Sequence, residues 1–92
     1  MITAIVFVNA ETARIPEVAE AIAALDGVSE VYSVTGQIDL IALVRVRRHE
    51  DIASVVSDQL NKVPGVVDTE THIAYRAYSR HDLESAFSIG LD

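Results

Sequence analysis

The sequence predicts an α+β sandwich in which two helices cover one face of a four-stranded antiparallel sheet. Residues 2–8 and 38–46 are apolar at almost every position, which is typical of central strands that are covered on both faces. Residues 16–25 and 50–60 instead carry apolar side chains at helical spacing. The links at 25–28 and 63–66 resemble each other, which indicates two similar β-α-β halves.

The first half of the chain begins with a strand over residues 2–8. Pro16 then suits the first turn of a helix, and Gly27 ends that helix. Its apolar residues at helical spacing are Val18, Ala19, Ile22 and Leu25. Residues 28–35 predict a second strand, joined to a third over 38–47 by a tight connection at Gly36 and Gln37. These two strands form an antiparallel hairpin.

The second half supplies one more helix and one more strand. Glu50 and Asp51 suit the positive end of a helix dipole, and Pro64 with Gly65 ends the helix. Its apolar residues are Ile52, Val55, Val56 and Leu60. Residues 66–75 alternate in a half-polar pattern that suits a sheet edge. The resulting order, β-α-β-β-α-β, is the ferredoxin-like sandwich.

This architecture leaves one face of the sheet without helices. Because the first and third strands supply aliphatic side chains to both faces, a single subunit would expose an apolar patch of about several hundred Å². A second copy packed sheet against sheet would remove this patch from water. We therefore expect a homodimer, which buries apolar area at about 25 cal/mol per Å² before the costs of association.

Composition limits the class of protein. The chain has 92 residues, enough for one domain, and half of them are hydrophobic. Seven Lys and Arg against fourteen Asp and Glu give a formal charge of -7, which disfavours direct nucleic-acid binding. The sequence has no cysteine and no apolar run of about 20 residues, so we expect a cytoplasmic protein without disulfides or membrane spans.

No group of residues has the pattern of a catalytic or metal centre, and we expect no cofactor. The histidines at 49, 72 and 81 lie in different segments without ligand spacing, and no serine lies in a G-x-S-x-G elbow. Asp39 is the most informative position, because a carboxylate at the start of an aliphatic strand needs hydrogen-bond donors. Asp39 either caps the turn or binds a ligand.

The hairpin residues, Val34-Thr35-Gly36-Gln37-Ile38-Asp39, are followed by an aliphatic strand and later by Val63-Pro64-Gly65-Val66 and Thr69-Glu70-Thr71. This combination resembles the C-terminal effector domain of the leucine-responsive regulatory protein/AsnC family, the RAM domain. The resemblance spans residues 1 to 77, and residues 78–92 form a C-terminal extension that we expect to be a short helix or a tail. The resemblance implies a homodimer that pairs through its sheets and assembles into a ring, an octamer or a decamer.

The resemblance also implies a binding site for a small, amino-acid-like effector at the hairpin turn, between dimers. Carried over to this chain, the contacts are Thr35, Gly36, Gln37 and Asp39, with Gln59 and Ile73 as weaker candidates. Asp39 would receive the effector's ammonium group. The position before the Asp, often aromatic in the family, is Ile38 here, which leaves the effector open.

Three functions remain in competition. The leading hypothesis is a non-enzymatic amino-acid-binding and oligomerisation module that modulates transcription regulators of its family without contacting DNA, including by hetero-association with full-length regulators. Family members that regulate transcription carry an N-terminal helix-turn-helix domain, and a first strand at residue 2 favours a stand-alone form. The alternatives are a dimeric α+β barrel enzyme such as a small monooxygenase, and a ring subunit without a ligand.

Overall fold

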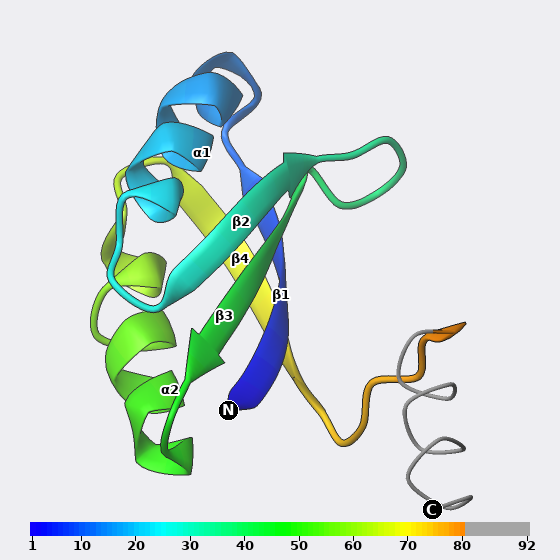
Figure 1. Ribbon diagram of the computed structural model, residues 1–92. Helices are drawn as coiled ribbons and strands as arrows, with labels where there is room; N and C mark the ends of the chain where they lie inside the picture. Colours follow the sequence, from blue (N-terminus) through cyan, green and yellow to red (C-terminus); the bar gives the residue numbers. More distant parts are fainter. Residues whose placement is uncertain (81–92) are drawn as a thin grey trace, which may run out of the picture.

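The computed structural model describes residues 1–80 and shows the expected α+β sandwich (Figure 1). The strands are β1 (Ile2–Ala10), β2 (Val28–Ser33), β3 (Leu40–Val46) and β4 (Val66–Ala74), and the helices are α1 (Ile15–Ala23) and α2 (His49–Val56). Two short 3-10 helices, η1 (Thr12–Arg14) and η2 (Leu60–Lys62), complete the described elements. The predicted C-terminal extension lies largely outside the described residues, and the domain boundary after residue 77 stays a prediction.

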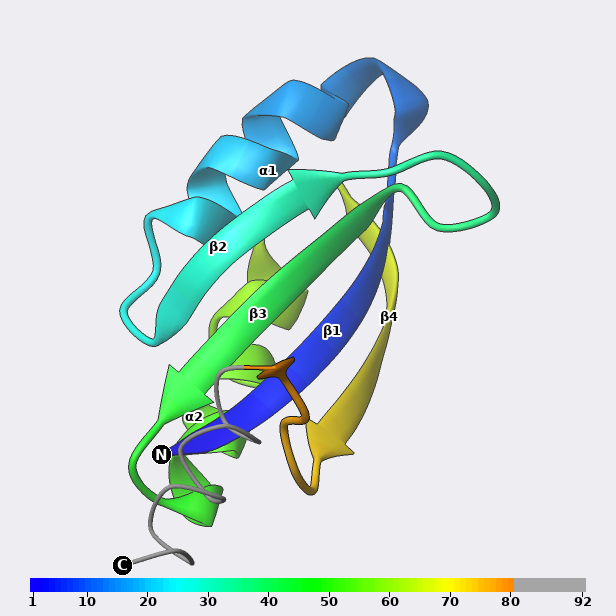
Figure 2. The ribbon, with the colours of Figure 1, turned by 45° about the vertical axis from the view of Figure 1, so that its right-hand side comes forward.

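The sheet has the strand order β2-β3-β1-β4, and all its pairs are antiparallel. The two strands that are apolar on both parities, β1 and β3, are therefore central, and the half-polar strand β4 is an edge. Both helices lie on one face of the sheet, and the other face carries no helix among the described residues (Figures 1 and 2). The predicted fold class is confirmed.

The core lies between the sheet and the helices. Every second residue of β1 and β3 is buried there, because successive side chains of a strand point to opposite faces. The buried residues are Ala4, Val6, Val8, Ala10, Val18, Ile22, Leu40, Ala42, Val44, Val46, Ile52, Val55, Val56 and Leu60. No polar or charged residue in the described part of the chain is buried.

The opposite parity of the same strands forms the open face, by which we mean the sheet face without helices. Ile5 lies beside Leu43, and Phe7 lies beside Ile41, so these four partly buried side chains form its centre. Tyr32 on β2 extends this apolar area toward the sheet edge and is 49% exposed. The predicted apolar patch outside the helices is therefore present in the single subunit.

The largest errors in the predicted boundaries lie at the β2–β3 connection and at the end of the second helix. The β2–β3 connection spans residues 34–39, so the tight connection at Gly36 and Gln37 is a longer loop, with Gly36 at φ +107°. The second helix ends at Val56, well before Pro64, and Leu60 belongs to η2. At the second helix the apolar spacing continued past the regular element, because the side chain of Leu60 packs into the core although it lies outside α2.

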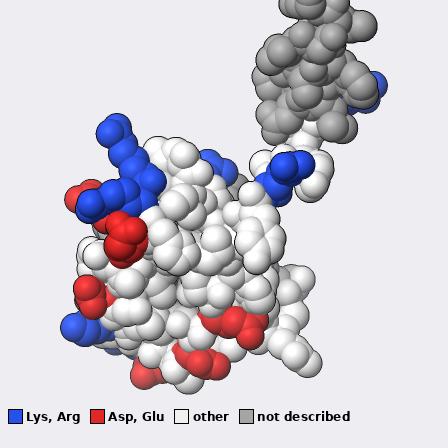
Figure 3. Space-filling model, turned by 90° about the horizontal axis from the view of Figure 1, so that it is seen from below, with Lys and Arg blue, Asp and Glu red and all other residues white. Residues whose placement is uncertain are grey.

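The end of the molecule at which β1 begins is shown in Figure 3. Uncharged side chains occupy most of the visible surface there, and charged side chains gather in small groups around it. Arg48 and Asp51, at the start of α2, form an ion pair with an Nη2 to Oδ1 distance of 3.4 Å. Exposed ion pairs of this kind contribute little to stability.

Candidate functional site

The β2–β3 loop projects beyond the sheet, as Figure 1 shows. Thr35, Gly36 and Gln37 are all exposed in it. A Cβ placed on Gly36 would meet nothing within 4 Å, so the subunit itself leaves the loop surface open. The exposed surface of this loop is therefore accessible to a ligand or to a neighbouring subunit.

Asp39 closes the base of this loop and is held by three hydrogen bonds. Its backbone N–H donates to the carbonyl oxygen of Val8 at 3.1 Å, and its carbonyl oxygen accepts from the N–H of Val34 at 3.1 Å. Its side-chain Oδ2 accepts from the N–H of Ala10 at 2.9 Å. The half-buried carboxylate thus has the backbone donor that the sequence argument required. Its other oxygen, Oδ1, has no hydrogen-bond partner within residues 1–80.

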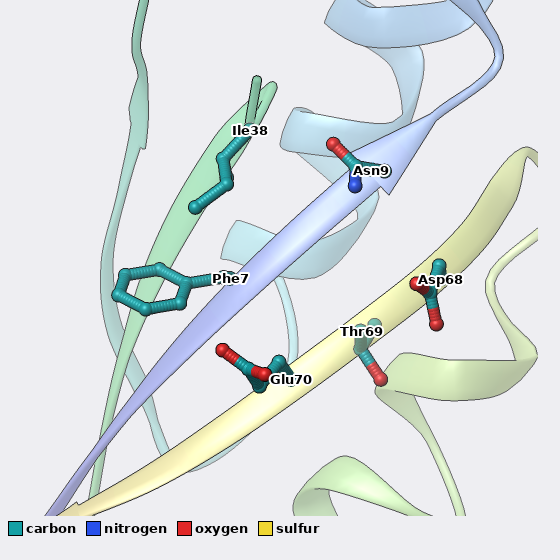
Figure 4. A pocket seen from close by; sticks show the side chains of 6 residues that line it. All are labelled: Phe7, Asn9, Ile38, Asp68, Thr69 and Glu70. Carbon is teal, nitrogen blue, oxygen red and sulfur yellow. The ribbon is translucent and has the colours of Figure 1, made fainter. Parts of the chain in front are cut away.

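An acidic hollow lies beside the loop base on the open face. It has a volume of about 150 Å³ and is lined by Phe7, Asn9, Ile38, Asp68, Thr69 and Glu70. Figure 4 shows Phe7 and Ile38 on one side of it and the two carboxylates on β4 on the other. Thr69 turns away toward η2, where its hydroxyl donates to Asn61 Oδ1 at 2.7 Å. The hollow therefore combines an apolar wall with two carboxylates.

The residues of this hollow were not predicted from the sequence. Asp68 and Glu70 share a parity in the half-polar segment, but their neighbours depend on the register between β4 and β1. In the structure Glu70 lies beside Phe7, and Asp68 lies beside Asn9. Alternation could have placed these side chains on one face, but it could not have placed them side by side.

Glu70 also contacts the next residue of its own face. His72 Nε2 lies 2.8 Å from Glu70 Oε2, and the His72 ring lies 5.1 Å from the Phe7 ring, centroid to centroid. His72 is exposed, at the margin of the apolar centre of the open face. The pair is an ion pair only when the imidazole is protonated.

A basic groove lies at the other end of the open face. It has a volume of about 400 Å³ and is lined by Met1, Thr3, Ile5, Leu43, Arg45, Ala74, Tyr75, Arg76 and Ala77. Arg45 donates to Ser29 Oγ at 3.3 Å, and neither Arg45 nor Arg76 forms an ion pair with a carboxylate of the described chain. Two arginines thus face an opening in a protein of net charge -7.

Beside this groove, at the β2 edge, Tyr32 donates a hydrogen bond to Glu30. This hydrogen bond, followed by the negative charge of Glu30, raises the pKa of the Tyr32 phenol above its ordinary value, and the positive charge of Arg45 opposes the shift. The phenol therefore stays protonated, and a donor, to a higher pH than an isolated tyrosine.

The two weaker candidates lie apart from the loop within one subunit. Gln59 follows α2 and donates from Nε2 to the carbonyl oxygen of Ser54 at 3.2 Å. Ile73 pairs with Ala4 and lines an apolar groove of about 300 Å³ between α2 and β4. Asp39 instead bonds to Val8, four residues farther along β1. The structure therefore brings Asp39 together with the loop, but not with Gln59 or Ile73, in a single subunit.

Two classes of site are missing from the described part of the chain. Within residues 1–80, no three His, Asp or Glu side chains are grouped so that they could hold a metal ion. In the same residues, no helix has the length and apolar character needed to cross a membrane.

The comparisons with known proteins decide the family. A family model described as the Lrp/AsnC ligand binding domain matches residues 3–83, which is most of the chain. The chain belongs to the Lrp/AsnC family. The resemblance inferred from the hairpin and the two later motifs is therefore confirmed.

Relatives of this Lrp/AsnC chain include transcription regulators. An uncharacterized HTH-type transcriptional regulator of Pyrococcus furiosus is 38% identical over 73 residues, which cover 79% of this chain and 49% of that protein. A regulator of Bacillus subtilis is 39% identical over 66 residues, which cover 72% of this chain and 39% of that protein. The chain thus spans about half the length, or less, of these curated relatives.

Solved structures of the family have the same fold. TTHA0845 from Thermus thermophilus matches with a TM-score of 0.82 and 48% identity, covering 87% of this chain and 100% of that chain. AsnC of E. coli matches with a TM-score of 0.78 over 85% of this chain and 53% of that chain. At 20% identity, the likeness to AsnC shows the fold alone.

Proposed function

We propose that this chain is a non-enzymatic module that binds a small amino-acid effector at the β2–β3 loop and assembles through its open face. In this role it modulates transcription regulators of its family without contacting DNA itself. Thr35, Gly36, Gln37 and Asp39 form the effector site of one subunit. Gln59 and Ile73 join the site only from a neighbouring subunit, because they lie far from the loop within their own.

The geometry of Asp39 carries this proposal. One carboxylate oxygen is fixed by the Ala10 N–H, so the side chain is held in place before a ligand arrives. The second oxygen has no partner among residues 1–80 and lies at the base of an exposed loop. An ammonium group supplies the charge-assisted hydrogen bond that such an oxygen accepts best. Fixing the acceptor in advance lowers the entropic cost of binding.

The comparisons add chemical support for an amino acid. The family model describes a ligand-binding domain, and the structure of the regulator NMB0573 of Neisseria meningitidis is a complex with L-Met. That regulator is 18% identical to this chain, so the likeness supports the fold alone. Its complex with L-Met is an example of a protein with this fold that binds an amino acid. The formal charge of -7 supports a role that does not involve direct contact with DNA.

The open face supports assembly. Ile5, Phe7, Ile41 and Leu43 form an apolar centre that no described element of the subunit covers. A second copy on this face forms the dimer, and contacts between dimers at the β2–β3 loops complete a ring, an octamer or a decamer. Full-length regulators of the family present the same fold, so mixed particles are the route by which this module reaches them.

The dimeric-barrel enzyme finds no support in the interior. Such an enzyme needs polar groups that converge on a cavity between sheet and helices. The inward positions Val6, Val18, Ile22 and Val56 are buried aliphatic residues, and the described core contains no polar residue. The interior is packed with hydrocarbon, which is the arrangement of a structural core.

The test is calorimetric titration of the full chain with each standard amino acid, on the wild type and on Asp39→Asn. We expect heat with a subset of amino acids and its loss in Asp39→Asn. Asp26→Asn is the matched control, because Asp26 is an exposed carboxylate remote from the loop. Absence of heat with every amino acid would overturn the effector proposal. Native mass spectrometry gives the particle size, and single subunits at micromolar concentration would overturn the assembly.

A further inference from the structure

Positive charge is concentrated at the end of the molecule where β3 and β4 finish. Five of the seven Lys and Arg residues lie in two short segments without Asp or Glu, residues 45–48 and 76–80. Both segments begin at the same end of the sheet, on either side of the start of β1 (Figure 2). Because the whole chain has a formal charge of -7, this end is a local exception to the charge of the protein.

The basic groove lies at this end and is lined by three side chains with free hydrogen-bond donors. Thr3 pairs with Arg45 on one side and with Ala74 on the other, so Thr3 and Arg45 lie level with each other on the open face. Arg76 follows two residues after Ala74 and lines the same groove. In the described part of the chain, Arg76 and the Thr3 hydroxyl have no hydrogen-bond or ion-pair partner, and Arg45 donates only to the Ser29 hydroxyl.

Two guanidinium groups that line one groove without a carboxylate raise each other's electrostatic energy, and a bound anion lowers it. Guanidinium groups also match the oxygens of phosphate and carboxylate in a forked, bidentate geometry. We infer that the basic groove binds a small organic oxyanion, that is, a phosphate or carboxylate group attached to an apolar or aromatic body. Arg45, Arg76 and the Thr3 hydroxyl donate hydrogen bonds to the oxyanion.

The size and the lining of the groove indicate that the anion has such a body. A volume of about 400 Å³ lies in the range of small-molecule sites. Ile5 and Leu43 line the part of the groove that adjoins the apolar centre, and the fully exposed Tyr75 lines another part. An exposed aromatic ring provides a surface on which a second ring can stack. The groove therefore offers hydrogen-bond donors for the oxyanion and apolar surface for the rest of the ligand.

The groove is separate from the proposed effector site. Asp39 directly precedes β3 and Arg45 is the sixth residue of that strand, which places them about 20 Å apart at the rise of an extended chain. The groove therefore adds a second ligand to the proposed function, with an oxyanion where the Asp39 site receives an ammonium group. It does not depend on the proposed assembly, because every residue that lines the groove belongs to one subunit.

Calorimetric titration of the full chain with phenyl phosphate, in a chloride buffer, tests the inference. We expect saturable binding to the wild type and a dissociation constant raised by about tenfold or more in Arg45→Gln/Arg76→Gln. Arg45→Lys/Arg76→Lys keeps the charge without the forked geometry and should raise the constant by about threefold or more. Arg14→Gln/Lys62→Gln is the matched control, because it removes the same charge at exposed positions outside the groove. Absence of saturable binding, or equal weakening in the control, would overturn the inference.

Three further probes separate the two parts of the ligand. Inorganic phosphate carries the anion without the ring, benzyl alcohol carries the ring without the anion, and phenylacetate replaces the phosphate by a carboxylate. We expect both aromatic anions to bind more tightly than inorganic phosphate, the tighter one identifying the preferred head group, and benzyl alcohol not to bind. Tyr75→Ala should weaken the aromatic anions by about threefold or more and leave inorganic phosphate unchanged. Equal affinity for inorganic phosphate and phenyl phosphate would show a site for the bare ion, which overturns the organic body.

Parallel titrations with amino acids keep this inference distinct from the proposed effector site. Asp39→Asn should leave phenyl phosphate binding unchanged, and Arg45→Gln/Arg76→Gln should leave the heat of amino-acid binding unchanged. Loss of amino-acid heat in the arginine variant would show that the groove receives the effector's carboxylate, which overturns a separate site. A change of particle size in that variant, with no anion bound by the wild type, would assign the arginines to a contact between subunits and also overturn the inference. Anion binding by a wild type that gives no heat with any amino acid would support the groove and overturn the effector proposal alone.

Discussion

The carboxylate of Asp39 accepts a hydrogen bond from the backbone N–H of Ala10, with an Oδ2 to N distance of 2.9 Å. Ala10 lies where the pairing of β1 with β4 shifts register. Such an irregularity disturbs the regular ladder of backbone hydrogen bonds. The side chain of Asp39 supplies an acceptor there, and in doing so it ties the start of β3 to the end of β1.

This relationship separates the structural role of Asp39 from its ligand role. Asp39→Asn retains an oxygen that can accept from Ala10 but loses the negative charge. We expect it to keep a near wild-type melting temperature and to lose amino-acid binding. Asp39→Ala leaves the Ala10 N–H without this acceptor and should cost about 1–3 kcal/mol of unfolding free energy in addition. Denaturant unfolding and calorimetry measure the two effects. Equal loss of stability in both variants would contradict this separation.

Much of the fold could be predicted because hydrophobic pattern reports burial. β1 and β3 are apolar on both parities, and this placed them at the centre of the sheet. Helix ends were harder, because Leu60 is buried although it lies in η2 and not in α2. A side chain is buried when it reaches the core, and residues in helices, 3-10 turns and loops can all reach it. The spacing of apolar residues therefore predicted which residues are buried better than it predicted where the helices end.

Less of the candidate site could be predicted. Asp39 was selected because a carboxylate in an aliphatic strand needs donors, and the structure supplies the Ala10 N–H. The identity of that donor could not be predicted, because it depends on where β1 meets β3 in space. Asp68 and Arg76 were missed for a similar reason. They line hollows at opposite ends of one sheet face, and that placement depends on the register between strands far apart in the sequence.

Two isoleucines provide a matched test of the core against the α2–β4 groove. Ile22 is fully buried on α1, whereas Ile73 is 38% exposed on β4. Ile22→Ala should cost about 2–5 kcal/mol, because it removes buried methyl groups and leaves a cavity. Ile73→Ala should cost less than about 1 kcal/mol, since its groove is open to water. Chemical denaturation measures both. If Ile73 contacts the effector from a neighbouring subunit, its variant will weaken amino-acid binding while keeping its stability.

Two glycines test where the backbone needs a residue without a side chain. Gly65 and Gly36 both have positive φ, at +99° and +107°, so alanine costs about 1–2 kcal/mol at either position. A Cβ on Gly65 would also lie 2.6 Å from Val18 Cγ2, inside the core. Because of this overlap, we expect Gly65→Ala to lower the free energy of unfolding by about 1–3 kcal/mol more than Gly36→Ala does. Equal melting temperatures for the two variants would show that the core around Val18 yields to the added methyl group.

Because of its hydrogen bond to Glu30, the Tyr32 phenol should titrate at a higher pH than an isolated tyrosine, and Glu30→Gln should lower the pH of that titration. The hydrogen bond to Glu30 and then the charge of that carboxylate raise the folded-state pKa of Tyr32. A raised pKa stabilises the fold below the unfolded-state value, and this contribution is lost as pH rises through the folded-state pKa. Glu30→Gln removes the charge, so the Tyr32 pKa should fall. Ultraviolet difference titration measures this without interference from tryptophan, which the sequence lacks. Tyr32→Phe identifies the Tyr32 component of the curve. A Tyr32 component that keeps its midpoint in Glu30→Gln would show that Glu30 does not control the phenol.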